Sequence, residues 1–528
     1  MPCKMFVFTL GAAVGGKPLL GAGFGGGRVG FGSGPVENFC TLVGQSSSPA
    51  FVETWLAASP LRTETRQASS LPIGAGLTFT SPICGRLGLL QFAFTMAIIS
   101  PFQAWRYDPN RVRVDQVVTQ PYDKITPETQ ERYYQASPAN LVRIILGKRQ
   151  ADDSAQENVY TRAAASFRDF RKSGVLRQDV EPSIYRYSQK FAVPGSTATA
   201  EREGYIALGQ TEDYSAGVVF RHELTHSGPK ADRLDLLRAT RTHFEQIFML
   251  YADSGGIESQ LRSDAAPDIE VTDEYGVLHR VWKVSDAAVI GGLQAQMREQ
   301  KLIIADGHHR YETALAYRDE RRKAAGSSAA ATYDSMMMTF FNMNSPGLVI
   351  LPTHRVVHGL PSFSADRLQA EAREFFKVEE VGPEIDGAQA AGLLHEAGRA
   401  SCALMVATAD RVLLMHSPRA VGTNRFAGLS LRQQALDVVQ LHKCLLEGVL
   451  KISEEAIRKL QNISYHREAA DALAEVRSGG AQAAFLMNPV RMEQVRDIAF
   501  AGEVLPQKST DFYPKLLSGL TIYGMDVE

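Results

Sequence analysis

The feature that most constrains this chain is the alternation, from Met96 onward, of short apolar runs with amphipathic helical stretches. Such alternation is typical of a sheet covered by helices, in an α/β or mixed α+β protein. The apolar runs at residues 302–305, 336–341 and 483–487 have the length of buried strands. The sequence therefore predicts a mixed α/β fold for this part of the chain.

Several helix ends are marked by local signals. Thr126, Pro127 and Glu128 combine a capping hydroxyl, a proline in the first turn and an acid near the positive helix end. Residues 158–172 form a helical pattern that stops before Gly174, a typical C-terminal glycine. We also expect helices at 232–247, 286–300, 431–450 and 468–477, and strands at 141–146, 184–193, 204–208, 348–351, 403–406 and 412–415, the last two paired.

Residues 1–95 differ from the rest of the chain. They contain no Asp or His and carry a glycine-rich tract at 21–34, a composition that buries too little apolar surface to offset chain ordering. They are a disordered extension, an acid-poor transit-type leader, or an upstream start with true initiation at Met96; we favour the last. We exclude them from the fold and divide the remainder into 96–332 and 333–528, the second portion contributing to the cleft.

Composition restricts the partners and the location. The net charge is −2, and because residues 1–95 hold six Lys/Arg and three Asp/Glu, residues 96–528 carry −5. This charge gives no attraction to nucleic acid. We expect no membrane span, since no stretch reaches the ~20 apolar residues required. The five cysteines form no CxxC pair, which favours a reducing, cytoplasmic setting.

The strongest candidate for a functional site is the Asp-Gly-His-His-Arg segment at 306–310, where a predicted strand ends and a helix begins. Glycine permits close approach of a ligand, and the free N–H groups of a helix start favour an anion. His308, His309 and Arg310 are suited to phosphate oxygens, and Asp306 to Mg²⁺ or a substrate hydroxyl. The alternative is a capping Asp306 followed by solvated side chains.

A second polar cluster, His-Glu-Leu-Thr-His at 222–226, matches the HExxH pattern of zinc hydrolases. On a helix its two histidines would face one metal, with the glutamate as general base. Gly228 and Pro229 would interrupt such a helix, so we expect a strand followed by a loop, where the histidines lie about 13 Å apart. His222 and Glu223 then fit a polar site better than a metal centre, and a zinc hydrolase is the less favoured alternative.

Three further segments are candidates for the same cleft. Lys508-Ser509-Thr510 lacks the glycines of a Walker A motif, yet with Lys515 it forms a basic segment able to close over an anion. A structural loop with solvated lysines is an equal alternative. His354 follows a predicted strand, and Asp123 lies in a turn after Pro121; each either lines the cleft or is purely structural.

These segments carry two resemblances. From Met96 to the end, about 430 residues, the chain resembles the domain-of-unknown-function 1015 family. The 306–310 turn is similar to that of the free serine kinases of the ParB/sulfiredoxin superfamily, which implies a ParB/sulfiredoxin-like N-terminal portion. The segments that carry the first resemblance are 121–123, 222–225, 230–233, 306–310, 346–355 and 508–515.

The kinase resemblance implies nucleotide phosphates against His309, Arg310 and the helix amides, with Asp306 near the transferred phosphoryl group and its Mg²⁺. A carboxylate must also take the proton of the accepting hydroxyl, and Glu223 is our candidate. The hypothesis is a small-molecule kinase for free serine or a similar hydroxyl compound, using ATP or ADP with Mg²⁺. The alternative is a non-catalytic nucleotide-binding regulatory protein.

The expected catalytic residues are Asp306, Glu223 and His309. The expected phosphate contacts are Gly307, His308, Arg310, Lys508, Ser509 and Thr510. The expected substrate contacts are His222, Thr225, Arg233, Asp123, His354 and Lys515.

Overall fold

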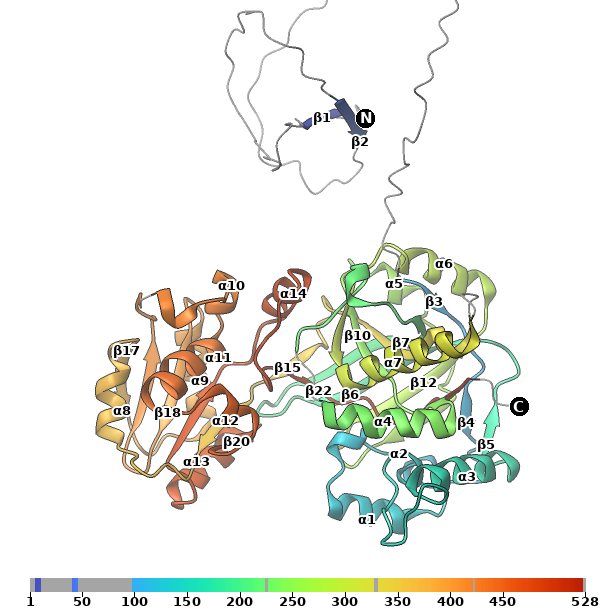
Figure 1. Cartoon of the computed structure of the whole chain (residues 1–528), viewed down its shortest axis with the longest axis horizontal. Coiled ribbons are helices and arrows are strands. Elements are labelled where there is room, and N and C mark those ends of the chain that lie inside the picture. Colours follow the sequence, from blue (N-terminus) through green and yellow to red (C-terminus); the bar gives the residue numbers. More distant parts are fainter. Residues whose placement is uncertain are drawn as a thin grey trace, which may run out of the picture. The chain divides into compact units, whose positions relative to one another are not determined.

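The computed structural model describes residues 97–525 apart from 224–226, 327–330 and 421–422, together with two short strands nearer the N-terminus (Figure 1). The chain divides into two compact units, Met1–Leu90 and Gln91–Glu528. In the first, β1 (Met5–Leu10) pairs antiparallel with β2 (Cys40–Gln45), a pairing that we did not predict. The other expectations for residues 1–95 lie outside the described residues.

A nine-stranded mixed sheet organises most of the second unit. Its order is β11-β12-β6-β7-β14-β10-β13-β8, and β3 also pairs with β7. The pairs β10–β14 and β13–β8 are parallel, and the others are antiparallel. The predicted mixed α/β fold is confirmed. The strands are β3 (Ile99–Ser100), β6 (Ile184–Ala192), β7 (Thr199–Gln210), β8 (Val219–Phe220), β10 (Ile247–Tyr251), β11 (Ile269–Thr272), β12 (Leu278–Val284), β13 (Leu302–Asp306) and β14 (Ser335–Asn342).

The central strands are apolar throughout because both faces of the sheet are covered. Along β13, Ile303 and Ala305 join one buried cluster, whereas Leu302 and Ile304 join another. This division follows from the alternation of side chains along a strand. The covering helices are α4 (Ser227–Thr240), α5 (Gly256–Ser259), α6 (Ala287–Met297) and α7 (His308–Ala325).

The predicted helix starts are confirmed by their capping contacts. Thr126 accepts a hydrogen bond from the Thr129 amide at the start of α1 (Pro127–Ala136), Asn158 caps α3 (Val159–Lys172), and Asp286 caps α6. Shorter single turns and edge strands complete this region: η2 (Val114–Gln116), η3 (Tyr122–Lys124), η4 (Tyr214–Ala216), η5 (Thr332–Asp334), β4 (Trp105–Tyr107), β5 (Leu176–Gln178), β9 (Thr242–His243) and β23 (Tyr523–Gly524).

Two predicted elements of this region are wrong, and a third follows in the second sheet. The run at 141–146 is not a strand: it forms the short helix α2 (Val142–Ile145), buried against α3, and a short apolar run has no periodicity that separates the two. The helix predicted at 232–247 ends earlier, at Thr240. Arg241 has a φ of 49°, and the chain then continues as β9 and β10.

A second sheet of six strands follows, in the order β17-β19-β18-β21-β16-β20. The predicted pairing of 403–406 with 412–415 is confirmed by β18 and β19. The helix predicted at 431–450 is instead broken into α10 (Leu431–Gln434), α11 (Asp437–Gln440) and a π-helix, η7 (Leu441–Val449). The remaining elements are β16 (His354–Val357), β17 (Lys377–Val381), β18 (Ala403–Ala407), β19 (Val412–His416), β20 (Ile463–His466), β21 (Ala483–Met487), η6 (Thr423–Phe426), α8 (Ala365–Ala372), α9 (Gly387–Gly398), α12 (Glu454–Arg458), α13 (Ala469–Arg477) and α14 (Met492–Phe500).

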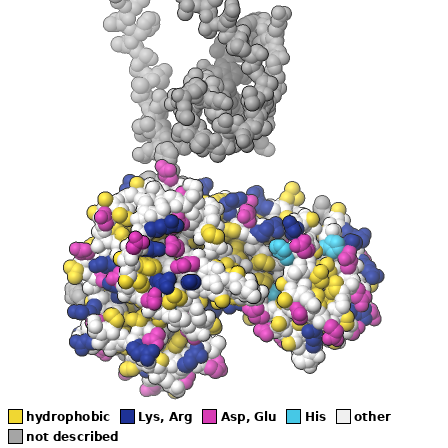
Figure 2. Space-filling model, turned by 180° about the vertical axis from the view of Figure 1, so that it is seen from behind, with side chains coloured by type: hydrophobic (Ala, Val, Ile, Leu, Met, Phe, Trp, Pro, Cys, Tyr) yellow, Lys and Arg dark blue, Asp and Glu magenta, His cyan; other side chains and the backbone are white. Residues whose placement is uncertain are grey.

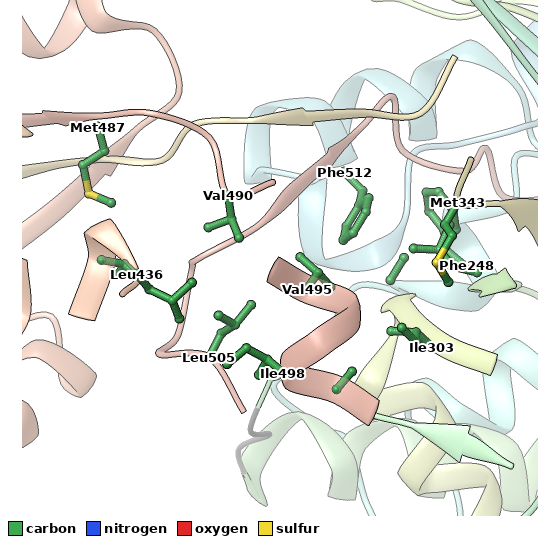
Figure 3. Packing of buried hydrophobic residues seen from close by; sticks show 14 of the residues in the cluster. Phe248, Ile303, Met343, Leu436, Met487, Val490, Val495, Ile498, Leu505 and Phe512 are labelled. Atoms are coloured by element: carbon green, nitrogen blue, oxygen red, sulfur yellow. The ribbon is translucent and has the colours of Figure 1, made fainter. Parts of the chain in front are cut away.

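The two sheets share one continuous hydrophobic core, and two-stranded pairs lie outside them. β14 lies in the middle of the nine-stranded sheet, so a division at Tyr333 would cut through that sheet. β15 (Val349–Leu351) pairs with β22 (Asp511–Tyr513), and β23 pairs with β9. In Figure 3, Val495 and Ile498 of α14 lie between Leu436 on one side and Ile303 on the other, and all four belong to one buried cluster.

The surface carries charges of both signs. On the face shown in Figure 2, Lys and Arg side chains are interspersed with Asp and Glu over both sheets. None of the helices in the described part of the chain is both long and apolar enough to cross a membrane.

Candidate functional site

A pocket of about 280 Å³ opens where β13 ends. It is lined from both sheets and from the strand pair β15–β22, and four cationic and four acidic side chains face it. The lining residues are Asp123, Lys124, Glu223, Asp306, Pro352, Thr353, Tyr465, His466, Arg467, Lys508, Thr510, Asp511 and Lys515.

A chain of ion pairs crosses this pocket. Asp306 Oδ2 accepts a hydrogen bond from Arg310 Nη2 at 2.9 Å, and Asp306 Oδ1 accepts one from Lys515 Nζ at 3.1 Å. The same Lys515 nitrogen lies 3.1 Å from Asp511 Oδ1, and Asp511 Oδ2 accepts from Arg467 Nε at 2.8 Å. The Lys515 side chain is only 11% exposed and links two carboxylates that are themselves largely buried.

Each charge in this chain is held by its neighbours. Burial alone would raise the pKa of Asp306, but Lys515 and Arg310 hold it well below its usual range. For Asp511 burial is likewise outweighed by Lys515 and Arg467, and the pKa is lowered. Burial would lower the pKa of Lys515, but the two carboxylates raise it. At neutral pH all these groups are therefore ionised.

The start of α7 depends on Gly307. Its φ of 93° is left-handed, and a Cβ there would lie 2.9 Å from Ile247 Cδ1. Arg310, one turn later, donates to the Gln246 carbonyl at 2.6 Å and lies 4.0 Å from Glu245. Its guanidinium thus fixes Asp306 and the start of β10.

Glu223 lies on the opposite wall, where the C-terminal segment meets the chain after β8. Glu223 Oε1 accepts a hydrogen bond from the Lys508 amide at 3.2 Å, and the His222 carbonyl accepts one from the Leu505 amide at 2.8 Å. Burial raises the pKa of the Glu223 carboxyl, opposed by Lys508. Lys508 itself is exposed and has a φ of 57°.

Two buried imidazoles lie behind the pocket. His222 has no exposed surface; its Nδ1 is 2.7 Å from the Ile304 carbonyl oxygen and its Nε2 is 2.8 Å from Thr510 Oγ1. The His308 ring lies 4.8 Å away, edge to face. Burial lowers the pKa of His222 to about 4, and lowers that of His308 well below its usual value. Both rings are therefore neutral at pH 7.

The pocket gathers six of the residues that the sequence singled out: Asp123, Glu223, Asp306, Lys508, Thr510 and Lys515. Others lie elsewhere. Arg233 donates to the Ile145 carbonyl, His354 accepts from the Met487 amide, and the Ser509 hydroxyl donates to the Pro506 carbonyl. His309 is half-buried in the first turn of α7, where its carbonyl accepts from Thr313. Thr225 lies outside the described residues.

Sequence reasoning did not single out Asp511, Arg467, Tyr465 or Lys124 as site residues. Asp511 had one available signal, because it lies four residues before Lys515 within a segment already considered. Arg467 had none: it follows β20, and only the tertiary fold brings it to the pocket.

The zinc alternative concerns this same wall. Both ring nitrogens of His222 have hydrogen-bonding partners within the protein, whereas His226 lies outside the described residues. Among the residues that the structure describes, no three His, Cys, Asp or Glu side chains are grouped to hold a metal ion.

Several solved structures are similar to this chain at low sequence identity. One is a conserved hypothetical protein from Pyrococcus furiosus (12% identity over 58% of this chain and 91% of that one, TM-score 0.29). A free serine kinase in complex with AMP matches at 12% identity over 58% and 88%, with a TM-score of 0.30. SbnI with a C-terminal truncation, from Staphylococcus aureus, matches at 12% over 59% and 85%, with a TM-score of 0.27.

No curated protein matches this chain. The family model described as "Protein of unknown function (DUF1015)" matches residues 99–439, more than half of the sequence. The chain therefore belongs to the DUF1015 family.

Proposed function

We propose that the pocket at Asp306 is the site of a phosphoryl-transfer enzyme, a small-molecule kinase that uses a nucleotide with Mg²⁺. The observation that carries the proposal is the joint presence of buried, ionised carboxylates and several cations around one pocket of about 280 Å³. Phosphoryl transfer requires little covalent chemistry from the protein; it requires positioning and neutralisation of charge.

The cations of the pocket supply the positive charge that neutralises the phosphates. Lys124, Arg467 and Lys508 face the pocket beside Lys515. Guanidinium and ammonium groups bind phosphate oxygens through charge-assisted hydrogen bonds. Lys508 is exposed and lies on the segment between α14 and β22, so we propose its ammonium as the group that first meets an entering phosphate.

We propose that Asp306 and Asp511 would hold a magnesium ion that arrives with a nucleotide, beside the three cations that now pair with their four oxygens. Mg²⁺ keeps several waters and is usually bound by one or two carboxylates together with phosphate oxygens. The two carboxylates are ionised and share Lys515 as a neighbour. The metal would supply neutralisation of charge on the phosphates, and Lys515 would keep the carboxylates in place.

Glu223 is the proposed base for the accepting hydroxyl. Its pKa is raised by burial, which brings a carboxylate closer to neutral pH and makes it a better proton acceptor. The nature of the acceptor, free serine or a similar hydroxyl compound, is proposed from the likeness of the 306–310 turn to that of free serine kinases. By the same likeness, His309 and the amides of that turn are proposed to contact the nucleotide phosphates from beside the pocket, whose lining they do not form.

The test is a screen for phosphorylated products with the full-length protein, ATP or ADP, Mg²⁺ and a panel of small hydroxyl compounds that includes L-serine. We expect a product with the wild type and its loss with Asp306→Asn. The matched control is Asp264→Asn, because Asp264 is exposed and does not line the pocket. Nucleotide binding that Asp306→Asn abolishes, without any product, would replace the kinase by the regulatory alternative; neither binding nor product would refute both.

A further inference from the structure

The hydroxyl of Thr510 has a fixed hydrogen-bonding direction. Thr510 lines the pocket, and the imidazole of His222 lies directly behind it, with Nε2 2.8 Å from Thr510 Oγ1. On the far side of the same ring, Nδ1 lies 2.7 Å from the main-chain carbonyl oxygen of Ile304, in β13. The three groups form a line from the strand that bears Asp306 to the pocket surface.

The proton positions along this line follow from the carbonyl. A carbonyl oxygen only accepts hydrogen bonds, so the proton of a neutral His222 must be on Nδ1. Nε2 is then a bare lone pair and can only accept. The Thr510 hydroxyl must therefore donate its single proton to His222. Burial keeps the ring neutral at pH 7 because it lowers the pKa of His222 to about 4.

The surroundings of the ring hold this arrangement. The His308 ring lies edge to face at 4.8 Å and the Phe512 ring at 5.9 Å from the ring of His222. The His222 carbonyl is bonded to the Leu505 amide at 2.8 Å. The ring has no exposed surface, so water does not compete for either nitrogen.

We propose that His222 is a positioning residue that accepts the hydrogen bond donated by the Thr510 hydroxyl. We propose that Thr510 is a specificity-determining residue, whose oxygen can only accept a hydrogen bond from a ligand in the pocket. A hydroxyl with its proton committed can accept a hydrogen bond from a ligand and cannot donate one. It favours a hydroxyl or ammonium group and disfavours a phosphate oxygen that carries no proton. Thr510 is thus proposed to contact the acceptor and not a phosphate oxygen, in place of the phosphate contact expected from the sequence.

The inference rests on the proposed kinase function and narrows its substrate class. The acceptor has, beside the hydroxyl that receives the phosphoryl group, a second hydrogen-bond donor: it is a polyol or an amino alcohol. A site built around such a bond discriminates against a compound that lacks the donor, because its own acceptor group is then left unpaired.

The experiment compares glycerol, ethanolamine and ethanol as acceptors for the full-length protein with ATP and Mg²⁺. We expect kcat/KM for glycerol or ethanolamine to exceed that for ethanol by about tenfold, the effect of one hydrogen bond. Thr510→Val should remove this preference, whereas Thr510→Ser, which keeps the hydroxyl, should retain it. Thermal unfolding of each variant confirms that it is folded.

Two results would overturn the inference while leaving the kinase intact. One is a preference that Thr510→Val retains. The other is a proton on Nε2 of His222, which ¹⁵N NMR of histidine-labelled protein detects without any turnover. Absence of product with these three acceptors and with every compound of the screen, L-serine included, would instead refute the proposed kinase, and this inference with it.

Discussion

Lys515 neutralises two acids of the proposed site, because two carboxylates lie within hydrogen-bonding distance of its ammonium group. Asp306 and Asp511 are each 3.1 Å away, and the lysine side chain is 11% exposed. Buried ions are tolerated only when their partners are present. Removal of the lysine would leave two partly buried acids with one cationic partner each, Arg310 for Asp306 and Arg467 for Asp511.

We therefore predict that Lys515→Met lowers the free energy of unfolding by about 3 kcal/mol, the range for breaking a buried pair. The control is Lys459→Met, whose partner Glu455 and own side chain are mostly exposed; it should change stability by less than about 0.5 kcal/mol. Urea unfolding at pH 7 measures both. Equal effects of the two substitutions would show that Lys515 has no special electrostatic role.

At the scale of the element, the junction of β13 and α7 is set by one backbone conformation. Gly307 has a φ of 93° and packs against Ile247 of β10 and the guanidinium of Arg310. A side chain there meets both a strained φ and a steric contact. Gly326, at the other end of α7, also has a positive φ of 60° but has open space around it.

These two glycines give a matched pair of variants. Gly326→Ala should cost about 1 kcal/mol, the strain of a left-handed alanine. Gly307→Ala should cost about 1–2 kcal/mol more, because the added Cβ lies 2.9 Å from Ile247 Cδ1. Chemical denaturation gives both values. A Gly307→Ala variant no less stable than Gly326→Ala would mean that β10 and α7 are not packed as described.

The element scale is also where sequence reasoning succeeded and failed. The strand at 302–305 and the helix after Gly307 were predictable because a buried apolar run is followed by capping and turn residues in immediate sequence. The run at 141–146 was not, because α2 and a buried strand share the same short apolar pattern. In the site, Asp306 and Lys515 carried local signals, whereas Arg467 reaches the pocket only through the folding of the second sheet.

At the scale of the whole molecule, burial of histidines couples folding to pH. Burial lowers the pKa of His222, His243 and His354 to about 4, whereas the unfolded value is about 6.5. The unfolded chain therefore binds more protons than the folded one in the window between these values. The contribution of these neutral histidines to the free energy of unfolding is fully present above about pH 6.5 and declines as the pH falls toward 4.

We predict that the free energy of unfolding decreases from pH 6.5 to pH 5, by up to about 1.4 kcal/mol per pH unit for each such histidine. His354→Asn should make this decrease smaller, because one of the buried imidazoles no longer titrates. Urea unfolding at pH 7, 6 and 5 provides the test. A stability that stays constant over this range would contradict the buried, neutral state of the three rings.

We propose above all that the pocket at Asp306 is where a phosphoryl group is transferred. The most direct measurement is ³¹P NMR of ATP, Mg²⁺ and an acceptor from the screen, followed over time with the full-length protein. We predict a growing phosphomonoester signal, matched by loss of the γ-phosphate, which Asp306→Asn abolishes and Asp264→Asn retains. A γ-phosphate that stays in place, or a product that forms equally with Asp306→Asn, would contradict the claim.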